Sequence, residues 1–271
     1  MSETLPSPSV TTVDPRTPGA ERTAVVTGAS SGIGRATAER LVADDWRVLA
    51  VARREERLSQ LAQENGCEIL RVDVTDDESV SRLAGRVDEL FPQGLHALVH
   101  VAGGALGTET VEGADLAKWR AMFESNTLGP VRVTQALLPA VRRSGSGSIL
   151  VLSSTAAQVA YEGGAGYNAA KAGEHMMAAA LRLELNGEPI RVIEIAPGMV
   201  ATEEFSLVRL GGDRAAAAAV YEGVEEPLRA EDVADVIAYA LHAPQHVNLD
   251  LVTLRPLAQA AAHKVARGAG I

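Results

Sequence analysis

The sequence predicts an α/β fold in which a parallel sheet is covered by helices on both faces. Short apolar runs rich in β-branched residues alternate along the chain with longer amphipathic runs, which is the pattern of repeated βα units. Some short runs, such as residues 95–101, are apolar almost throughout, as expected of strands buried on both faces. We find no internal repeat and no linker inside this alternating part, so we expect one domain.

Each element is predicted from the period of its apolar residues. We expect strands near residues 23–27, 46–51, 67–72, 95–101, 147–153, 190–196 and 248–254. We expect helices near residues 32–43, 55–64, 77–90, 115–143, 165–186 and 230–242. The alanine tract 215–219 also favours helix, because alanine has the highest helix propensity.

Composition limits the class of protein and its partners. The chain has 271 residues, of which 46% are hydrophobic, enough to bury one large core. Its net charge of −10 argues against nucleic acid as a partner, and no apolar run is long enough to span a membrane. Cys67 is the only cysteine, which excludes an intrachain disulfide and is typical of the reducing cytoplasm, where we expect the protein to work.

The two ends of the chain are expected to lie outside the folded domain. Residues 1–21 are rich in proline and lack a basic region followed by an apolar block, so we predict a disordered tail and not a signal peptide. The domain is then expected over residues 22–258, followed by a C-terminal tail at 259–271.

A glycine-rich turn follows the first predicted strand. The segment Gly28-Ala29-Ser30-Ser31-Gly32-Ile33-Gly34 lies between this strand and an amphipathic helix. In such a turn, backbone N–H groups and the positive end of the helix dipole can bind a pyrophosphate. The spacing is G-x-x-x-G-x-G and not the G-x-G-x-x-G of the standard dinucleotide fingerprint, so an ordinary strand–helix turn remains the alternative.

A second motif joins Tyr167 and Lys171, four residues apart and therefore on one face of a helix. A phenol normally has a pKa of about 10, and a nearby ammonium lowers that pKa toward neutrality. Ser154, just after the apolar run 148–153, can hydrogen-bond the same substrate oxygen. These groups can move a proton on and off an alcohol oxygen. Taken alone, however, Tyr-x-x-x-Lys occurs by chance in many helices.

Together, the two motifs resemble the classical short-chain dehydrogenases/reductases, whose hallmarks are T-G-x-x-x-G-x-G and Y-x-x-x-K. Here these motifs are Thr27 to Gly34 and Tyr167 to Lys171. Further matches are Asp73-Val74-Thr75, Ala102-Gly103, Asn126, Ser154 and Pro197 to Thr202. The resemblance covers residues 22–258 and implies a single-domain Rossmann fold with a doubly wound seven-stranded parallel sheet of order 3-2-1-4-5-6-7.

The resemblance also implies roles for individual residues. Tyr167 would exchange a proton with the substrate oxygen, and Ser154 would orient the carbonyl. Lys171 would lower the pKa of Tyr167 and bind the nicotinamide ribose, while Asn126 would complete the proton path through a water on its main-chain carbonyl. The implied cofactor-binding residues are Gly28, Ser30, Ser31, Gly32, Ile33, Gly34, Asp73, Val74, Ala102, Gly103, Tyr167, Lys171, Pro197, Gly198, Val200 and Thr202.

The local sequence gives a physical reason for the role of Asn126. Pro130, four residues later, lacks the N–H that would bond the carbonyl of Asn126, so the helix is expected to kink there. The alternative is that Pro130 only kinks the helix and Asn126 faces solvent.

The end of the second strand predicts the cofactor. Residues 51–54, Val-Ala-Arg-Arg, contain no acidic residue that would bind a ribose 2′-hydroxyl. Arg53 can instead pair a 2′-phosphate, with Arg54 beside it and Ser30 as a further donor. We therefore expect NADP(H), preferred over NAD(H). The alternative is that both arginines pair with Glu55 and Glu56 at a solvated helix start.

Histidines appear at two places where they invite a functional interpretation. Most relatives read Asn-Asn-Ala-Gly where this chain has His100-Val101-Ala102-Gly103, which raises doubt about local geometry and cofactor affinity. We expect His100 to be a buried histidine satisfied by backbone groups. His242 and His246 are separated by Pro244 and have no Cys or carboxylate cluster nearby, so we expect no metal site.

The segment 202–226 is expected to be a mobile lid over the active site, since it contains Gly211-Gly212. Its sequence from Glu203 to Arg209, then Gly212-Asp213, resembles the 3-hydroxy acid (serine) dehydrogenase branch, as do the stretches 246–249 and 255–259. That branch uses NADP with small 3-hydroxy acids or the matching semialdehydes. Arg209 can bind a substrate carboxylate, although an exposed lid arginine is more often solvated.

Two other functions remain open from the sequence. One is a 3-oxoacyl or polyketide ketoreductase, and the other is a non-catalytic NADP-sensing protein. The resemblance also implies a homo-oligomer, a dimer or tetramer, through the helices at 115–143 and 165–186. The run from His175 to Leu181 has small and flexible apolar residues that suit close helix packing.

Overall fold

A computed structural model describes residues 21–268, which form a parallel seven-stranded sheet of order β3-β2-β1-β4-β5-β6-β7. The strands are β1 (Arg22–Thr27), β2 (Trp46–Ala52), β3 (Glu68–Arg71), β4 (Ala97–His100), β5 (Gly147–Leu152), β6 (Ile190–Pro197) and β7 (Val252–Leu254). The predicted Rossmann topology is confirmed. Because the strand order reverses between β1 and β4, the carboxyl ends of these strands open into a crevice, the usual ligand site of such sheets.

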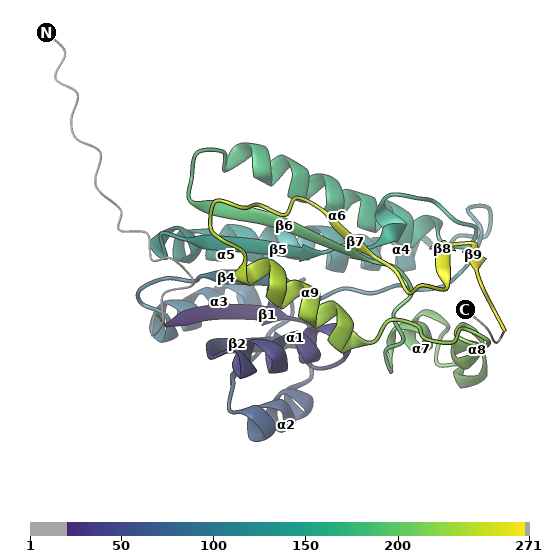
Figure 1. Cartoon of the computed structure of the whole chain (residues 1–271), viewed down its shortest axis with the longest axis horizontal. Helices are drawn as coiled ribbons and strands as arrows, with labels where there is room; N and C mark the ends of the chain where they lie inside the picture. The colour runs from purple at the N-terminus through teal and green to yellow at the C-terminus, as the bar shows by residue number, and fades with distance from the viewer. Residues whose placement is uncertain (1–20, 269–271) are drawn as a thin grey trace, which may run out of the picture.

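Helices cover both faces of this sheet (Figure 1). They are α1 (Gly32–Ala43), α2 (Glu55–Asn65), α3 (Asp77–Leu90), α4 (Leu116–Phe123), α5 (Gly129–Arg143), α6 (Ala165–Glu184) and α9 (Ala230–His242). One buried cluster joins Val26 and Leu150 of the sheet to α1, α2 and α9. Their sequence neighbours Val25 and Ile149 point to the opposite face and pack with α3, α5 and α6. The alternation of side chains along each strand therefore builds two cores.

The predicted helix at 115–143 is interrupted as Pro130 requires. Between α4 and α5 the chain makes a π-helical turn, η1 (Glu124–Leu128), in which the Gly129 N–H donates to the Glu124 carbonyl. Asn126 lies in this turn and is fully buried, which excludes the alternative that it faces solvent. The regular helical hydrogen bonding is therefore interrupted near Pro130, as expected, by a π-turn at the edge of the site.

The segment after β6 forms two short helices, α7 (Phe205–Arg209) and α8 (Arg214–Ala219). Beyond β7, the short strands β8 (Gln259–Ala261) and β9 (Lys264–Val265) pair as an antiparallel hairpin. Figure 1 shows both features at the same end of the molecule.

The two predicted tails differ in how far the structure describes them. Residues 1–20 of the predicted disordered tail lie outside the described residues. The predicted C-terminal tail is described as far as Gly268 and is not a simple tail, because it contains the β8–β9 hairpin. The hairpin is anchored where the Gln259 side-chain oxygen accepts a hydrogen bond from the Met199 N–H at 2.7 Å. No helix within residues 21–268 has the length and apolar character needed to cross a membrane.

Candidate active site

The glycine-rich turn has a geometry that only glycine allows at two positions. Gly28 has φ +70°, and a Cβ on it would lie 2.9 Å from the backbone of Ala102. A Cβ on Gly34 would lie 2.4 Å from the Gly28 carbonyl oxygen. The Ser31 side chain, at the N-cap of α1, does not cap the free N–H groups of the first turn. The turn is therefore a tight cradle with unbonded donors, which fits the diphosphate of a dinucleotide.

The Asn126 side chain ties the π-turn to the loop after β4. Its Nδ2 donates to the carbonyls of Gly104 (3.0 Å) and Met122 (2.7 Å), and its Oδ1 accepts from the Gly104 N–H at 3.0 Å. A Cβ on Gly103 would lie 2.4 Å from this Oδ1. Asn126 therefore fixes the Ala102-Gly103-Gly104 segment through its side chain, a contact that the sequence did not predict.

Ser154 and Tyr167 approach each other from two elements. Ser154 follows β5 and begins a 3-10 turn, η2 (Thr155–Ala157), with its Oγ accepting from the Ala156 N–H at 3.1 Å. Tyr167 lies in the first turn of α6 and is buried. Phe205 of α7 packs edge-on against the Tyr167 ring, with 5.7 Å between ring centroids. The segment after β6 therefore covers the tyrosine.

The pKa of Tyr167 differs from the sequence-based expectation. Burial raises the pKa of the phenol above its ordinary value, whereas Lys171 and the Ser154 hydroxyl lower it, and burial prevails. Lys171 thus acts in the expected direction, but the net pKa of Tyr167 is not lowered. The reason is that a phenolate loses hydration in the protein interior.

Lys171 is buried and has two hydrogen-bond partners. Its Nζ donates to the Leu152 carbonyl at 2.8 Å and to Glu174 Oε2 at 2.6 Å. Burial lowers the pKa of Lys171, but the nearby acids, Glu174 foremost, outweigh burial and the net pKa is raised. Sequence reasoning missed Glu174. The available signal was its position three residues after Lys171, on the same helix face.

Arg54 is the central residue of a polar cluster beside the glycine turn. Its guanidinium donates to Ser30 Oγ (2.9 Å), to Ser31 Oγ (2.8 Å) and to Glu204 Oε1 (2.6 Å). Arg57 also pairs with Glu204 at 3.2 Å. The alternative that Arg54 pairs with the two glutamates following it is wrong, because its acidic partner is Glu204, from the segment after β6. An arginine with two serine hydroxyls is a donor set suited to a phosphate.

The remaining predicted cofactor residues lie along the same edge of the sheet. Arg53 is exposed at the end of β2, next to β3, after which come Asp73 and Val74. Burial raises the pKa of Asp73, but hydrogen bonds from Thr75 and the charge of Arg53 prevail and the net pKa is lowered.

The other predicted cofactor residues follow β6. Pro197 ends this strand, and the Gly198 N–H donates to the Leu254 carbonyl at 2.8 Å. Val200 forms an isolated bridge with Leu228. Thr202 lies beside the glycine turn, since a Cβ on Gly32 would be 3.3 Å from its Cγ2.

His100 is internal and neutral. Its Nε2 lies 2.9 Å from Thr134 Oγ1, and burial lowers the pKa of His100 to about 3. The expectation of a buried histidine is confirmed, but its expected backbone partners are wrong, because the ring nitrogen reaches a threonine hydroxyl of α5. The neighbouring loop is supported by Thr27, whose Oγ1 accepts from the N–H groups of Val101 and Ala102 at 3.0 Å each.

Arg209, the last residue of α7, is held over the tyrosines. Its guanidinium carbon lies 5.4 Å from the Tyr161 ring centroid and 5.9 Å from that of Tyr167. It donates to the Tyr161 hydroxyl (2.9 Å) and to the carbonyls of Gly163 (3.1 Å) and Gly107 (3.2 Å). Among residues 21–268, no carboxylate pairs with Arg209. It is half-buried, so the expectation of a solvated lid arginine is wrong, and Tyr161 is a contact that sequence reasoning missed.

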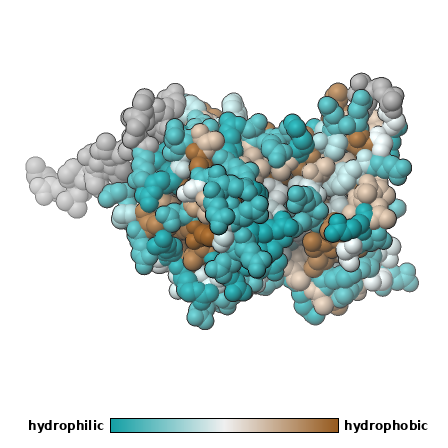
Figure 2. All heavy atoms as spheres, turned by 90° about the horizontal axis from the view of Figure 1, so that it is seen from below, coloured by the Kyte–Doolittle hydropathy of each residue, from teal (hydrophilic) through white to brown (hydrophobic). Residues whose placement is uncertain are grey.

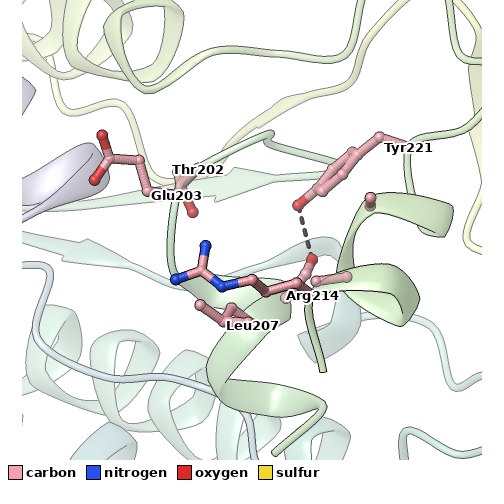
Figure 3. Close-up of a pocket in the computed structure, with 8 residues that line it drawn as sticks. Thr202, Glu203, Leu207, Arg214 and Tyr221 are labelled. Carbon is pink, nitrogen blue, oxygen red and sulfur yellow. Dashed lines mark hydrogen bonds between the residues drawn. The ribbon is translucent and has the colours of Figure 1, made fainter. Parts of the chain in front are cut away.

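A hollow of about 250 Å³ lies inside the segment after β6. Figure 3 shows residues that border it, among them Thr202, Glu203, Leu207, Arg214 and Tyr221. The Tyr221 hydroxyl lies 2.9 Å from Ser206 Oγ and also donates to the Val200 carbonyl. Neither Tyr167 nor Lys171 lines this hollow. It is therefore a gap between α7 and α8 and not the place where the tyrosine meets a substrate.

Comparison with known proteins agrees with this geometry. Residues 22–209 match the sequence profile of the family described as short chain dehydrogenase. The chain is 49% identical over 244 residues to an uncharacterized oxidoreductase of Mycobacterium tuberculosis (90% of this chain, 94% of the relative). It is 41% identical over 241 residues to sulfoacetaldehyde reductase 2 of Chromohalobacter salexigens (87% and 94%). Among solved structures, the closed form of serine dehydrogenase complexed with NADP+ has a TM-score of 0.85 and 33% identity (89% and 97%).

The fold, the crevice and these matches define an oxidoreductase. The chain belongs to the short-chain dehydrogenase family, as the two sequence motifs predicted. Its similarity to serine dehydrogenase also agrees with the predicted branch.

Proposed function

We propose that this enzyme transfers a hydride between NADP(H) and a small substrate that carries an anionic group, a 3-hydroxy acid or the matching semialdehyde. The observation that carries the proposal is Arg209, a half-buried cation that has no acidic partner among residues 21–268 and lies over the ring of Tyr167. Its bonds to two carbonyls and a phenol leave its positive charge uncompensated. An anionic substrate supplies that compensation.

In this proposed reaction, the protein's own residues carry out the proton transfer. Tyr167 gives its phenol proton to the substrate oxygen in reduction and takes it back in oxidation. Ser154 orients the substrate carbonyl, and Lys171 holds positive charge beside the phenol, opposing the effect of burial. Asn126 fixes the loop after β4 and offers its main-chain carbonyl to a water. When bound, the nicotinamide supplies or accepts the hydride at the substrate carbon.

The polar cluster around Arg54 supports NADP(H) as the preferred cofactor. Arg53 and Arg54 would bind the 2′-phosphate with Ser30 and Ser31, while Gly28, Gly32 and Gly34 allow the diphosphate to approach α1. The similar serine dehydrogenase structure contains NADP+. The other proposed cofactor contacts are Ile33, Asp73, Val74, Ala102, Gly103, Lys171, Pro197, Gly198, Val200 and Thr202.

The relatives support an anionic substrate as well. Sulfoacetaldehyde, named in one relative, is an aldehyde with a sulfonate, and serine, named in the similar structure, is a hydroxy compound with a carboxylate. Both are small, and both place a negative group close to the reacting carbon. The segment 202–226, which carries Arg209, would then act as the lid that brings the cation to the substrate. A ketoreductase for neutral acyl chains gains nothing from this cation.

The first prediction concerns the reaction. Wild-type protein should oxidise NADPH with malonic semialdehyde or sulfoacetaldehyde, or reduce NADP with serine or 3-hydroxybutyrate. Tyr167→Phe removes only the phenol oxygen and should lower kcat by about 100-fold or more, because the proton donor is lost. The absorbance of the reduced nicotinamide measures both. Tight NADPH binding with no turnover of any of these compounds would instead favour a sensing protein.

The second prediction concerns Arg209. Arg209→Met keeps much of the apolar length but removes the charge, and it should raise KM for an anionic substrate by about 10-fold or more, the loss of one charge-assisted contact. A neutral aldehyde of similar size should be little affected. Arg214→Met, on α8 and away from Tyr167, is the matched control. Equal losses for the charged and the neutral substrate would contradict the proposed role.

The third prediction concerns cofactor choice. Arg54→Ala should raise KM for NADPH by about 10-fold or more, because a charge-assisted contact to the phosphate contributes about 1.5–3 kcal/mol. KM for NADH should hardly change, and 2′,5′-ADP should inhibit the variant more weakly while 5′-AMP is unaffected. Arg82→Ala, on the surface of α3, is the control. A parallel change with both cofactors would show that Arg54 supports the fold and does not read the phosphate.

The fourth prediction concerns assembly, since we also propose a homo-oligomer through α4, η1 and α6. Exposed apolar side chains gather on these packed elements: Leu116 (58% exposed), Phe123 (44%), Leu128 (40%), Met176 (63%) and Leu183 (80%). The face drawn in Figure 2 is, by contrast, mainly hydrophilic with small separate apolar patches. Light scattering should show a dimer or tetramer that Met176→Glu with Leu183→Glu dissociates. A wild-type monomer would refute this interface.

A further inference from the structure

Behind Tyr167 and Lys171 lies a buried group of ionisable side chains that the proposed reaction does not use. Glu174 and His175 follow Lys171 on α6, Glu194 faces them from β6, and Ser153 lies just after β5. Glu174 and Glu194 are each 1% exposed. Two buried carboxyl groups are costly in a protein core unless they are paired or protonated. Their presence therefore needs a physical explanation.

These side chains form two directly bonded pairs. At the inner end, Lys171 Nζ donates to Glu174 Oε2 at 2.6 Å. At the outer end, Glu194 Oε2 lies 2.8 Å from His175 Nδ1, and the Ser153 hydroxyl donates to Glu194 Oε1. The His175 side chain is 30% exposed, so the outer pair reaches the surface. The inner pair belongs to the residue that supports the reacting tyrosine.

The two pairs influence each other electrostatically, through the charges of Glu174 and Glu194. Burial raises the pKa of Glu174 to about 7, Lys171 opposes this change, and the negative charge of Glu194 adds to it. A carboxyl group with this pKa changes its protonation state near neutral pH. A carboxyl group with a pKa near the working pH both accepts and donates protons readily.

We propose that Glu174 exchanges protons with Lys171, and that Glu194 and His175 connect Glu174 to the surface. These four residues form a proton path behind Tyr167, which we call the rear path. This proposal rests on the proposed role of Tyr167 as proton donor. The path uses other residues than the one expected at Asn126, which lies in the π-turn η1. Glu174 acts through Lys171 and is a positioning residue that also stores a proton.

The proton balance is simple in the reduction direction. The O–H bond of Tyr167 breaks and the substrate oxygen gains the proton, which leaves a phenolate. The Lys171 ammonium gives one N–H proton to the phenolate, and the carboxyl O–H of Glu174 then gives its proton to the Lys171 amine. The Glu174 carboxylate regains a proton from the surface through Glu194 and the His175 imidazole. Oxidation runs the same transfers backwards, with no electron leaving these groups.

Charged and titratable groups face Glu174 from two elements. On α6 they are Tyr167 and Lys171, and on β6 there is Glu194, which His175 contacts in turn. The π-turn packed against α6 contributes Thr127, whose hydroxyl donates to the Ala170 carbonyl and carries no charge. Lys171 is therefore the one cation bonded directly to Glu174 among the described residues. A change at Glu174 acts first on Lys171 and through it on Tyr167.

The fifth prediction tests this path with Glu174→Gln, which keeps the shape and a hydrogen-bond acceptor for Lys171 but cannot take up a proton. In wild-type enzyme, oxidation needs the Glu174 carboxylate, so its rate should fall as the pH drops through about 7. Reduction needs the protonated form, so its rate should fall as the pH rises through the same range. In Glu174→Gln, both changes near neutral pH should disappear, and kcat should be about tenfold lower, since a positioned proton-transfer group contributes at least that much.

Controls separate this path from a structural role and from the proposed function itself. Glu184→Gln changes an exposed glutamate of the same helix and should leave the pH profile unaltered. Tyr167→Phe should abolish turnover whether or not the rear path exists. A Glu174→Gln enzyme with the wild-type pH profile and kcat overturns the rear path while leaving the proposed function intact.

Two further measurements keep the test decisive if Glu174→Gln does not fold. His175→Ala should slow turnover in dilute buffer, and added imidazole should restore it, because a small base can replace the missing ring at the surface. Carbon-13 NMR of the glutamate carboxyl groups, with no substrate present, should show one that titrates near neutral pH. Absence of both the imidazole rescue and the neutral titration overturns the proposal.

Discussion

The buried ammonium of Lys171 is the constraint on which the site depends. Only 5% of this residue is exposed, and an unpaired charge at that depth would be strongly destabilising. The Leu152 carbonyl and the Glu174 carboxyl satisfy it. Because Leu152 ends β5 and Lys171 lies in α6, this contact fixes the helix to the sheet at the edge where the crevice opens. Tyr167, one turn earlier on the same helix face, is thereby placed beside Ser154, which follows β5.

The segment after β6 is attached to the rest of the molecule at two places, Glu204 and Arg209, whose charges have different partners. Near its start, Glu204 is paired with Arg54 and Arg57 beside the glycine turn. At the end of α7, the Arg209 carbonyl accepts from the Gly107 N–H at 2.8 Å. Within the described part of the chain, the Arg209 guanidinium bonds only neutral groups. The charge is therefore compensated at the cofactor end and uncompensated at the substrate end. The charge of Arg209 is therefore the reason why an anionic substrate is expected.

Whether the sequence predicted a feature of this site depends on how far apart in the chain the interacting residues lie. The strands, the glycine turn and the Tyr167–Lys171 pair are local patterns, so their period and spacing sufficed, while the strand order came from the family resemblance. Glu174 was missed because a glutamate three residues after a lysine is usually a solvated surface pair. The partners of His100 and Arg54 were also missed, because Thr134 and Glu204 are distant in the sequence and only the fold brings them near. Asn126 was found through Pro130, yet its side-chain role depends on a loop that local sequence does not place.

The protonation state of Glu174 affects the charges of both Lys171 and Tyr167. When Glu174 is ionised, its negative charge favours the Lys171 ammonium and also raises the pKa of Tyr167. When Glu174 is protonated, the second effect disappears, and only burial and Tyr161 still oppose the stabilisation of a phenolate by Lys171. The protonated state therefore suits the moment just after Tyr167 has given up its proton, and the ionised state suits a tyrosine that still holds one. A carboxyl group with a pKa near 7 can change between these states within the physiological range, which a surface glutamate with an ordinary pKa cannot do.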